Sequence, residues 1–194
     1  MAEEARMASS GANPDGAALL DRVRQGDADA WKTFVDQYEG VVAATVIGMI
    51  GRGPDAEDIG QEVFIRFFRN AANFRGDADV STYLTRSAIN LSLNAIKRRQ
   101  RMRRWFFGPP EDRFEAPELP ADKALERTEL GTLVSSAIRA LPADFRSVAV
   151  LRLVQEHSTA ETAAILGIPE GTVMSRLSRA QKRLREMLGG VIDG

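Results

Sequence analysis

Residues 161–185 read ETAAILGIPEGTVMSRLSRAQKRLR, and this stretch indicates two helices separated by a short hinge. At the hinge, Gly167 can adopt the left-handed conformation that ends a helix, and Pro169 cannot donate a hydrogen bond to a continuing one. We therefore expect a new helix to begin near Glu170. Its apolar residues recur at steps of three and four, as in an amphipathic helix: Val173, Leu177, Ala180, Leu184 and Leu188.

The other faces of this second helix are polar and basic, with arginines along one side. Such a pair of helices is typical of a helix-turn-helix, whose second helix enters the major groove of DNA. An ordinary helical hairpin with a solvated basic face is the alternative, but the hinge, the spacing and the arginines together favour DNA binding. The candidate DNA-contacting residues are Thr172, Ser175, Arg176, Ser178, Arg179, Lys182 and Arg183.

Composition excludes several classes of protein. The 194 residues include no cysteine, so a disulfide framework, a thiolate metal site and a thiol nucleophile are excluded. The single histidine, His157, has no second imidazole, so a metal site or a serine-histidine triad lacks parts. We expect no enzymatic activity, cofactor, metal or small-molecule substrate. Without an apolar run of roughly 18 residues or a signal sequence, the chain is expected to be cytoplasmic and not inserted in a membrane.

The net charge of -1 hides a strong segregation along the chain. Residues 1–65 carry a net charge of -7, residues 66–105 carry +8, residues 106–130 carry -4 and residues 131–194 carry +2. A basic block is suited to nucleic acid, whereas an acidic block is suited to basic surfaces of protein partners. The pattern therefore predicts contacts with both.

Helical periodicity accounts for most of the chain. Apolar stripes of helical period occupy residues 31–49, 59–71 and 84–95, and a weaker one lies at 19–23. Residues 106–122 break this periodicity, because they hold four prolines and five acidic residues against one arginine.

We predict an all-α fold of two small helical domains joined by a proline-rich acidic linker, with the helix-turn-helix in the second domain. The expected boundaries are a flexible tail at 1–16, a helical domain at 17–105, the linker at 106–122, and a helix-turn-helix domain at 123–194.

The order of motifs resembles the extracytoplasmic-function sigma factors, a class of bacterial proteins that direct RNA polymerase to promoters. The matching segments are DAEDIGQEVF at 55–64, FRGD at 74–77 with Tyr83-Leu84 and Asn90, Ala140-Leu141-Pro142, and ILGIPEGTV at 165–173 with SRLSRA at 175–180. The resemblance covers nearly everything from Leu19 to Leu188.

The resemblance implies that the first domain recognises the -10 element and captures a flipped base of the non-template strand. The helix at 81–104 and the loop at 75–81 would do this, and the implied contacts are Arg75, Asp77, Val80, Tyr83, Arg86, Asn90, Asn94, Lys97, Arg98 and Arg101. Asparagines suit base edges, whereas lysines and arginines suit phosphates. The chain departs from the family pattern at Val80, Tyr83 and Asn94, where an aromatic residue, tryptophan and aspartate are common, and at Met174, where a basic residue is usual.

The resemblance also implies partners. The DAEDIGQEVF helix would dock on the clamp helices of the largest subunit of core RNA polymerase through Asp55, Asp58, Gln61 and Glu62. A carboxylate site for Mg²⁺ is the rival interpretation, but no phosphate-cradling glycine loop accompanies these acids.

Further expected partners are the flap of the second-largest subunit, promoter DNA both double-stranded and melted, and an anti-sigma factor, which in some cases holds its partner at the inner membrane face. The linker carboxylates would lie toward the RNA exit path: Glu111, Asp112, Glu115 and Glu118. Two other classes of protein stay open. An autonomous helix-turn-helix regulator leaves residues 55–90 unexplained, and a decoy that binds only regulatory proteins has no need for the basic residues.

Overall fold

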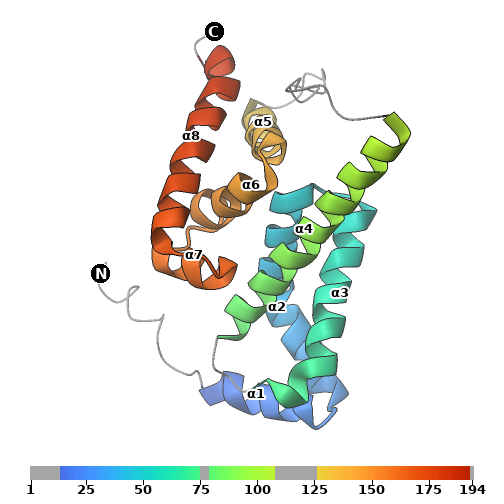
Figure 1. Cartoon of the computed structure of the whole chain (residues 1–194). Helices are drawn as coiled ribbons and strands as arrows, with labels where there is room; N and C mark the ends of the chain where they lie inside the picture. The colour runs from blue at the N-terminus through green and yellow to red at the C-terminus, as the bar shows by residue number, and fades with distance from the viewer. Residues whose placement is uncertain (1–13, 75–78, 108–125, 193–194) are drawn as a thin grey trace.

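The structure, a computed structural model, describes residues 14–74, 79–107 and 126–192, and all the regular structure in these ranges is helical. The N-terminal bundle consists of α1 (Pro14–Arg24), α2 (Ala28–Ile50), α3 (Pro54–Asn70), the 3-10 turn η2 (Ala71–Asn73) and α4 (Val80–Phe107). The C-terminal bundle consists of α5 (Glu126–Ala140), α6 (Ala143–Ala149), the π-helical turn η3 (Val150–Val154), α7 (Thr159–Leu166) and α8 (Glu170–Ile192). Figure 1 shows α2, α3 and α4 packed together, with α1 across their lower end. The predicted all-α class is confirmed.

An aromatic core joins α2 to α3. Phe34 of α2 lies nearly parallel to Phe67 of α3 with ring centroids 4.6 Å apart, and both side chains are almost fully buried. Leu84 of α4 closes this core from a third side. Phe68, which falls within the apolar stripe expected at residues 59–71, is instead 49% exposed and contacts Trp31 edge-on at 4.9 Å. It is displaced from the core because consecutive helical residues are rotated by about 100°, and Phe67 already faces inward.

Specific residues fix the ends of α2 and the start of α3. The Asp27 carboxylate accepts hydrogen bonds from the backbone N–H groups of Asp29 and Ala30, each at 3.0 Å. The bond from Ala30 and then the Arg22 side chain hold the pKa of Asp27 below its ordinary value. At the other end, Gly51 has φ 85, a conformation that suits glycine, and α3 opens at Pro54. The chain therefore reverses sharply and places α3 against α2.

Two helices extend beyond the predicted boundaries. Helix α1 begins at Pro14, inside the predicted tail of residues 1–16, because proline is favourable in the first turn of a helix. Helix α4 continues to Phe107, although the linker was expected from residue 106. The first proline after α4 stands at position 109, so nothing forbids helix at 106 and 107. The rest of the predicted linker lies outside the described residues.

The helix-turn-helix forms as the sequence predicts. Gly167 ends α7 in the left-handed conformation with φ 64, and α8 begins at Glu170. At the start of α7, the Ser158 hydroxyl and the Glu161 carboxylate each accept a backbone N–H of the other residue, which is a capping box. The expected apolar face of α8 is inward: Val173, Ala180 and Leu184 are buried, and Leu177 and Leu188 are half-buried.

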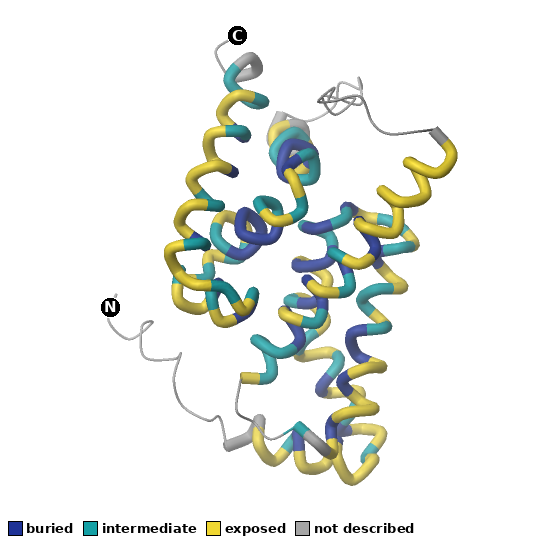
Figure 2. Tube along the Cα trace, in the orientation of Figure 1, coloured by how far each residue is buried: buried dark blue, intermediate teal, exposed yellow. Residues whose placement is uncertain are grey.

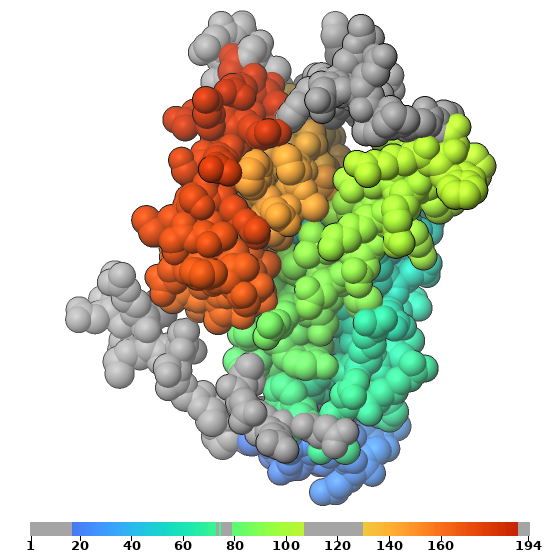
Figure 3. All heavy atoms as spheres, viewed as in Figure 1, coloured from blue at the N-terminus to red at the C-terminus, as the bar shows by residue number. Residues whose placement is uncertain are grey.

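The two bundles share part of their hydrophobic core, which the sequence did not indicate. Met49 of α2 and Ile89 and Ile96 of α4 lie in one buried cluster with residues of the C-terminal bundle, including Ile138, Leu141, Leu151 and Ile165. Helices α5 and η3 contact α2, while α6 and α7 contact α4. Figure 2 shows buried segments of both bundles in the middle of the molecule, and the space-filling view shows the C-terminal bundle in contact with α4 (Figure 3). The described parts of the two bundles are therefore directly packed.

Candidate nucleic-acid interface

Helix α4 carries a line of polar residues on the side away from its core. They recur at steps of three and four, and they are Tyr83, Arg86, Asn90, Asn94, Lys97 and Arg101, here named the α4 polar stripe. Tyr83 is half-buried and the others are exposed. At 1.5 Å per residue the stripe is about 27 Å long. Amides and cations in such a line can reach base edges and phosphates of a nucleic acid lying along the helix.

The first turn of α4 is built into the N-terminal bundle. Val80 is half-buried and packs on the core. The Tyr83 ring meets the rings of Phe67 and Phe74 edge-on, at 5.7 Å and 5.4 Å between centroids. Arg98 is exposed just beside the α4 polar stripe. Arg75 and Asp77, expected to contact the -10 element, lie outside the described residues.

Helix α8 presents a second polar face, but some of its basic residues contact the neighbouring helix α6. Ser175, Ser178, Arg179 and Lys182 are exposed. Arg176 is half-buried and donates to the Asp144 carboxylate at 3.3 Å. The Arg183 guanidinium lies 5.5 Å from the centre of the Phe145 ring. Thr172 is half-buried at the start of the helix, and Met174 is 63% exposed. The predicted face therefore exists, with Arg179 projecting farther from the bundle contacts than Arg176.

The predicted protein-docking residues share an exposed side of α3. Asp55, Asp58 and Glu62 follow at steps of three and four, with Gln61 beside them, and we name these four residues the α3 acidic strip. Asp55 pairs with Arg99 of α4, whose hydrogen bond and charge lower the pKa of Asp55. Glu62 accepts from Arg66 at 2.7 Å. Asp58 and Gln61 are exposed, so they are available to a partner.

Comparison with known proteins decides which family has this pair of bundles. Residues 34–102 match the family model for Sigma-70 region 2, and residues 132–184 match the model for Sigma-70, region 4. The ECF RNA polymerase sigma factor SigW of Bacillus subtilis is 32% identical over 87% of this chain and 94% of its own length. The ECF RNA polymerase sigma-E factor of Escherichia coli is 34% identical over 86% of this chain and 90% of its own.

The chain belongs to the ECF family of RNA polymerase sigma factors. It therefore acts in promoter recognition and transcription initiation, as a regulatory protein of transcription. The solved sigma factor RpoE of Bartonella quintana, in complex with the anti-sigma factor NepR, has the same fold, with a TM-score of 0.63 and 23% identity over 81% of this chain and 96% of that one. Region 2 lies in the N-terminal bundle and region 4 in the C-terminal bundle.

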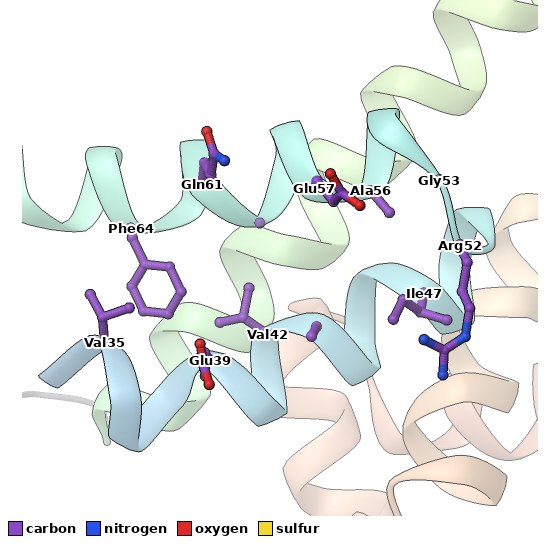
Figure 4. A pocket seen from close by; sticks show the side chains of 12 residues that line it. Val35, Glu39, Val42, Ile47, Arg52, Gly53, Ala56, Glu57, Gln61 and Phe64 are labelled. Carbon is purple, nitrogen blue, oxygen red and sulfur yellow. The ribbon is translucent and has the colours of Figure 1, made fainter. Parts of the chain in front are cut away.

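Region 2 of this sigma factor also contains a groove that sequence reasoning missed. The groove, of about 360 Å³, lies between α2 and α3 next to the α3 acidic strip (Figure 4). Val42 and Phe64 provide apolar wall, and Glu39 and Gln61 add polar groups. Gly60 also lines the groove, and a Cβ added there would meet no atom within 4 Å. Among the residues that line the groove, only Gln61 was predicted to bind a partner. Glu39 was not predicted, because it precedes the motif that carried the resemblance.

The tip of α4 is a second feature missed by sequence reasoning. Met102, Trp105 and Phe106 are 56%, 87% and 71% exposed, at the end of the run of basic residues. They extend one apolar face of α4 beyond the bundle, a signal visible in the sequence as apolar residues at helical spacing.

In the part of the chain that the structure describes, no helix has the length and apolar character needed to cross a bilayer. Among the same residues, acids and histidine form no cluster of three that could hold a metal ion.

Proposed function

We propose that this ECF sigma factor divides its work between α4, α8 and α3. The α4 polar stripe reads the -10 element and holds the opened strand, α8 reads the -35 element, and the α3 acidic strip docks on core RNA polymerase. The single observation that carries this proposal is the α4 polar stripe, because its members repeat with the period of the helix and all of them except Tyr83 are exposed. If this face of α4 served only to pack against the core, its residues would be buried.

Within the stripe, chemistry suggests a division of roles. Asn90 and Asn94 each offer a donor and an acceptor, which suit the edges of bases. Lys97 and Arg101, farther along the helix, suit phosphates because their charge is not sequence-selective. Tyr83 lies in the first turn of α4, where its half-buried aromatic ring is suited to contact an unpaired base.

In α8, the exposed residues of the first half support contact with duplex DNA. A recognition helix presents its N-terminal residues to base edges and its flanks to phosphates. Arg179 is exposed and is our main candidate for a base contact, with Ser175, Ser178 and Lys182 around it. Arg176 and Arg183 are expected to bind phosphate or to orient α8 on α6, because both already contact that helix.

The polymerase contact is supported by charge and shape together. Asp58 and Gln61 are exposed on α3, and an apolar groove lies next to them. An acidic rim around apolar surface suits an amphipathic partner helix with basic residues. We assign this partner as the clamp helices of the largest polymerase subunit, with the flap of the second-largest subunit contacting the C-terminal bundle.

An anti-sigma factor is the further partner that we propose. The sigma factor RpoE of Bartonella quintana, which has this fold, was solved with such a protein. We also retain the proposal that the linker acids lie toward the RNA exit path, although these acids lie outside the described residues.

Transcription with purified core polymerase tests the proposed function. The chain, core polymerase and a library of promoters are expected to yield transcripts that start downstream of a shared pair of -10 and -35 sequences. Asn90→Ala with Asn94→Ala should change the selected -10 sequence and leave the -35 sequence as it was. Specific binding of duplex DNA without core polymerase, and no transcripts with it, would instead identify an autonomous helix-turn-helix regulator.

A further inference from the structure

A large apolar side chain near the start of α8 is exposed. Of the large apolar residues at 170–189, the part of α8 whose side chains the structure describes, Met174 is the exposed one, at 63%. It is rotated by about 100° around the helix axis from Val173, which is fully buried, so it lies outside the inward apolar face. Packing within the bundle therefore does not account for a methionine at this position.

Small residues surround Met174 on the surface of the helix. Its neighbours three positions before and four positions after are Gly171 and Ser178. A Cβ added at Gly171 would meet no atom within 4 Å. The hydroxyl of Ser175 donates to the carbonyl oxygen of Thr172 at 3.0 Å, which keeps that side chain close to the helix. Met174 therefore projects from a low surface that a partner can approach closely.

The surroundings of Met174 favour DNA as the partner over a protein. Arg179 and Lys182 are exposed on the neighbouring outward face of α8, and their charges attract a polyanion. A specific protein interface covers about 800 Å² on each partner, whereas one methionine supplies far less apolar surface than that. A single side chain is enough, however, to contact one group in a groove of DNA.

The chemistry of Met174 selects one group of the DNA. Its thioether has no hydrogen-bond donor for a phosphate oxygen, and the exposed carboxylate of Glu170 one turn before it repels phosphate. The major groove offers an apolar group of its own, the C5-methyl of thymine, which side chains recognise by apolar contact. The flexible and polarizable methionine side chain is well suited to follow the position of such a methyl group.

We propose that Met174 determines specificity at one base pair of the -35 element by contacting the C5-methyl group of a thymine. This inference rests on the proposed role of α8 in reading that element. Burial of a group of this size changes affinity by about fourfold. The -35 sequence that the protein selects should therefore contain a thymine at the base pair that faces Met174.

Uracil in place of thymine tests the contact, because uracil keeps the base pairing and lacks only the methyl group. Holoenzyme made from the chain and core polymerase is given two competing promoters, which differ by thymine or uracil at one position of the selected -35 element. Each thymine of the element is tested in turn, on either strand. The natural chain should favour the thymine promoter about fourfold at one of these positions.

Variants of Met174 should change this preference according to their chemistry. Met174→Ala removes the contacting atoms, and Met174→Gln keeps an unbranched chain but makes its end polar, so both should transcribe the two promoters equally. Met174→Leu stays apolar and should keep a preference of at least about twofold. Met174→Arg places paired donors that suit guanine, so selection from a promoter library should replace this thymine by another base pair.

Gln181→Ala is the matched control. Gln181 is exposed two turns after Met174 on the same side of α8. A residue that contacts only phosphate changes the binding of both promoters alike, so Gln181→Ala should keep the fourfold preference for thymine. Because Met174 is exposed, its variants should keep the helical circular dichroism spectrum of the natural chain and, without DNA, its affinity for core polymerase.

Three results would overturn the contact. The first is equal transcription of the thymine and uracil promoters by the natural chain at every thymine of the element. The second is a preference that Met174→Ala retains, because that preference would come from the DNA itself. The third is a loss of affinity for core polymerase in Met174→Ala without DNA, which would assign the side chain to a protein interface.

Failure of the proposed function would be seen separately, as the absence of promoter-specific transcripts with the natural chain. The same pairs of thymine and uracil duplexes, taken from sequences that the free chain selects from the library, would then measure the contact by binding alone. If the free chain selects no duplex either, the contact is overturned together with the proposed function.

Discussion

Helices α4 and α8 both carry basic residues for DNA, yet the structure makes these residues available in different ways. On α4 the five members of the polar stripe after Tyr83 are all exposed. On α8, Arg176 and Arg183 contact α6, and Arg179 is the exposed arginine in the first half of the helix. Helix α4 holds seven basic residues and no acidic one, whereas α8 holds five basic and two acidic residues. The comparison teaches that charge count alone does not determine which cations reach a ligand, because packing against α6 engages two of the arginines of α8.

The largest expected effect is on α4, where we assign direct base contacts. Asn90→Ala with Asn94→Ala should weaken recognition of the -10 element by about 1 to 3 kcal/mol for each lost contact. Competition between natural and altered -10 sequences in a transcription assay measures this loss. Gln100→Ala is the matched control, because Gln100 is exposed on the same helix but lies outside the stripe. Equal effects of Gln100→Ala and the double variant would refute the role of the α4 polar stripe in recognition of the -10 element.

The comparison becomes sharper within α8. Arg179→Ala should weaken -35 binding by about 1 to 3 kcal/mol if Arg179 reaches a base, and Arg176→Ala should have the smaller effect. Arg176 is half-buried and already donates to the Asp144 carboxylate, so less of its side chain is open to DNA than that of Arg179. Binding of labelled -35 duplex by the two variants gives the order, with Arg185→Ala as an exposed control on another side of α8. A larger loss for Arg176→Ala would reverse the ranking of the two arginines.

A smaller effect is expected for the α3 acidic strip, which contacts protein rather than DNA in our proposal. Asp58→Arg should lower affinity for core polymerase by about tenfold, or 1.4 kcal/mol, because it places a cation against a basic partner. Asp36→Arg makes the same charge change on an exposed residue of α2 and should leave the affinity as it was. Competition with a labelled sigma factor measures both, and circular dichroism checks the helical fold. Equal binding of core polymerase by the two variants would contradict the proposed role of the α3 acidic strip.

The smallest effect is expected on folding stability rather than on binding, at the cap of α7 in the C-terminal bundle. Ser158→Ala removes the cap of α7 and should cost about 1 kcal/mol of unfolding free energy.

Hydrogen bonds from Ser158 hold the pKa of Glu161 below its ordinary value, so this carboxylate stabilises the fold at neutral pH. Its contribution is complete above the unfolded pKa and declines as the pH falls through the lower folded pKa. The difference in stability between the natural chain and Glu161→Gln, measured by urea denaturation, should therefore shrink from pH 7 to pH 3. A difference independent of pH would contradict this role.

Much of the fold could be predicted because its signals are local. Gly167 and Pro169 mark the hinge, and the period of Val173, Ala180 and Leu184 marks the inner face of α8. Phe68 falls within the apolar stripe expected at residues 59–71 but is exposed, since an aromatic residue next to a core position fits the period loosely and points about 100° away. The end of α4 at Phe107 was also missed, because changes in composition mark a linker less sharply than the first proline does.

The candidate sites followed the same pattern. The resemblance to a known family supplied the members of the α4 polar stripe and the α3 acidic strip, and most of these residues are exposed in the structure. It could not find the groove at Glu39 and Gly60, whose two walls come from different helices. It also gave no sign that Asp144 and Phe145 would contact Arg176 and Arg183, because these partners are more than thirty residues apart in the chain.

The sequence by itself determined the helices, their caps, the hinge and the family of this protein, because each depends on neighbours within a few positions or on a fixed order of motifs. Only the tertiary structure decided that Met49, Ile89 and Ile96 share a core with the C-terminal bundle, and that Arg146 caps α2. These contacts join residues about fifty to one hundred positions apart, and no local preference encodes which distant surface a buried side chain will meet.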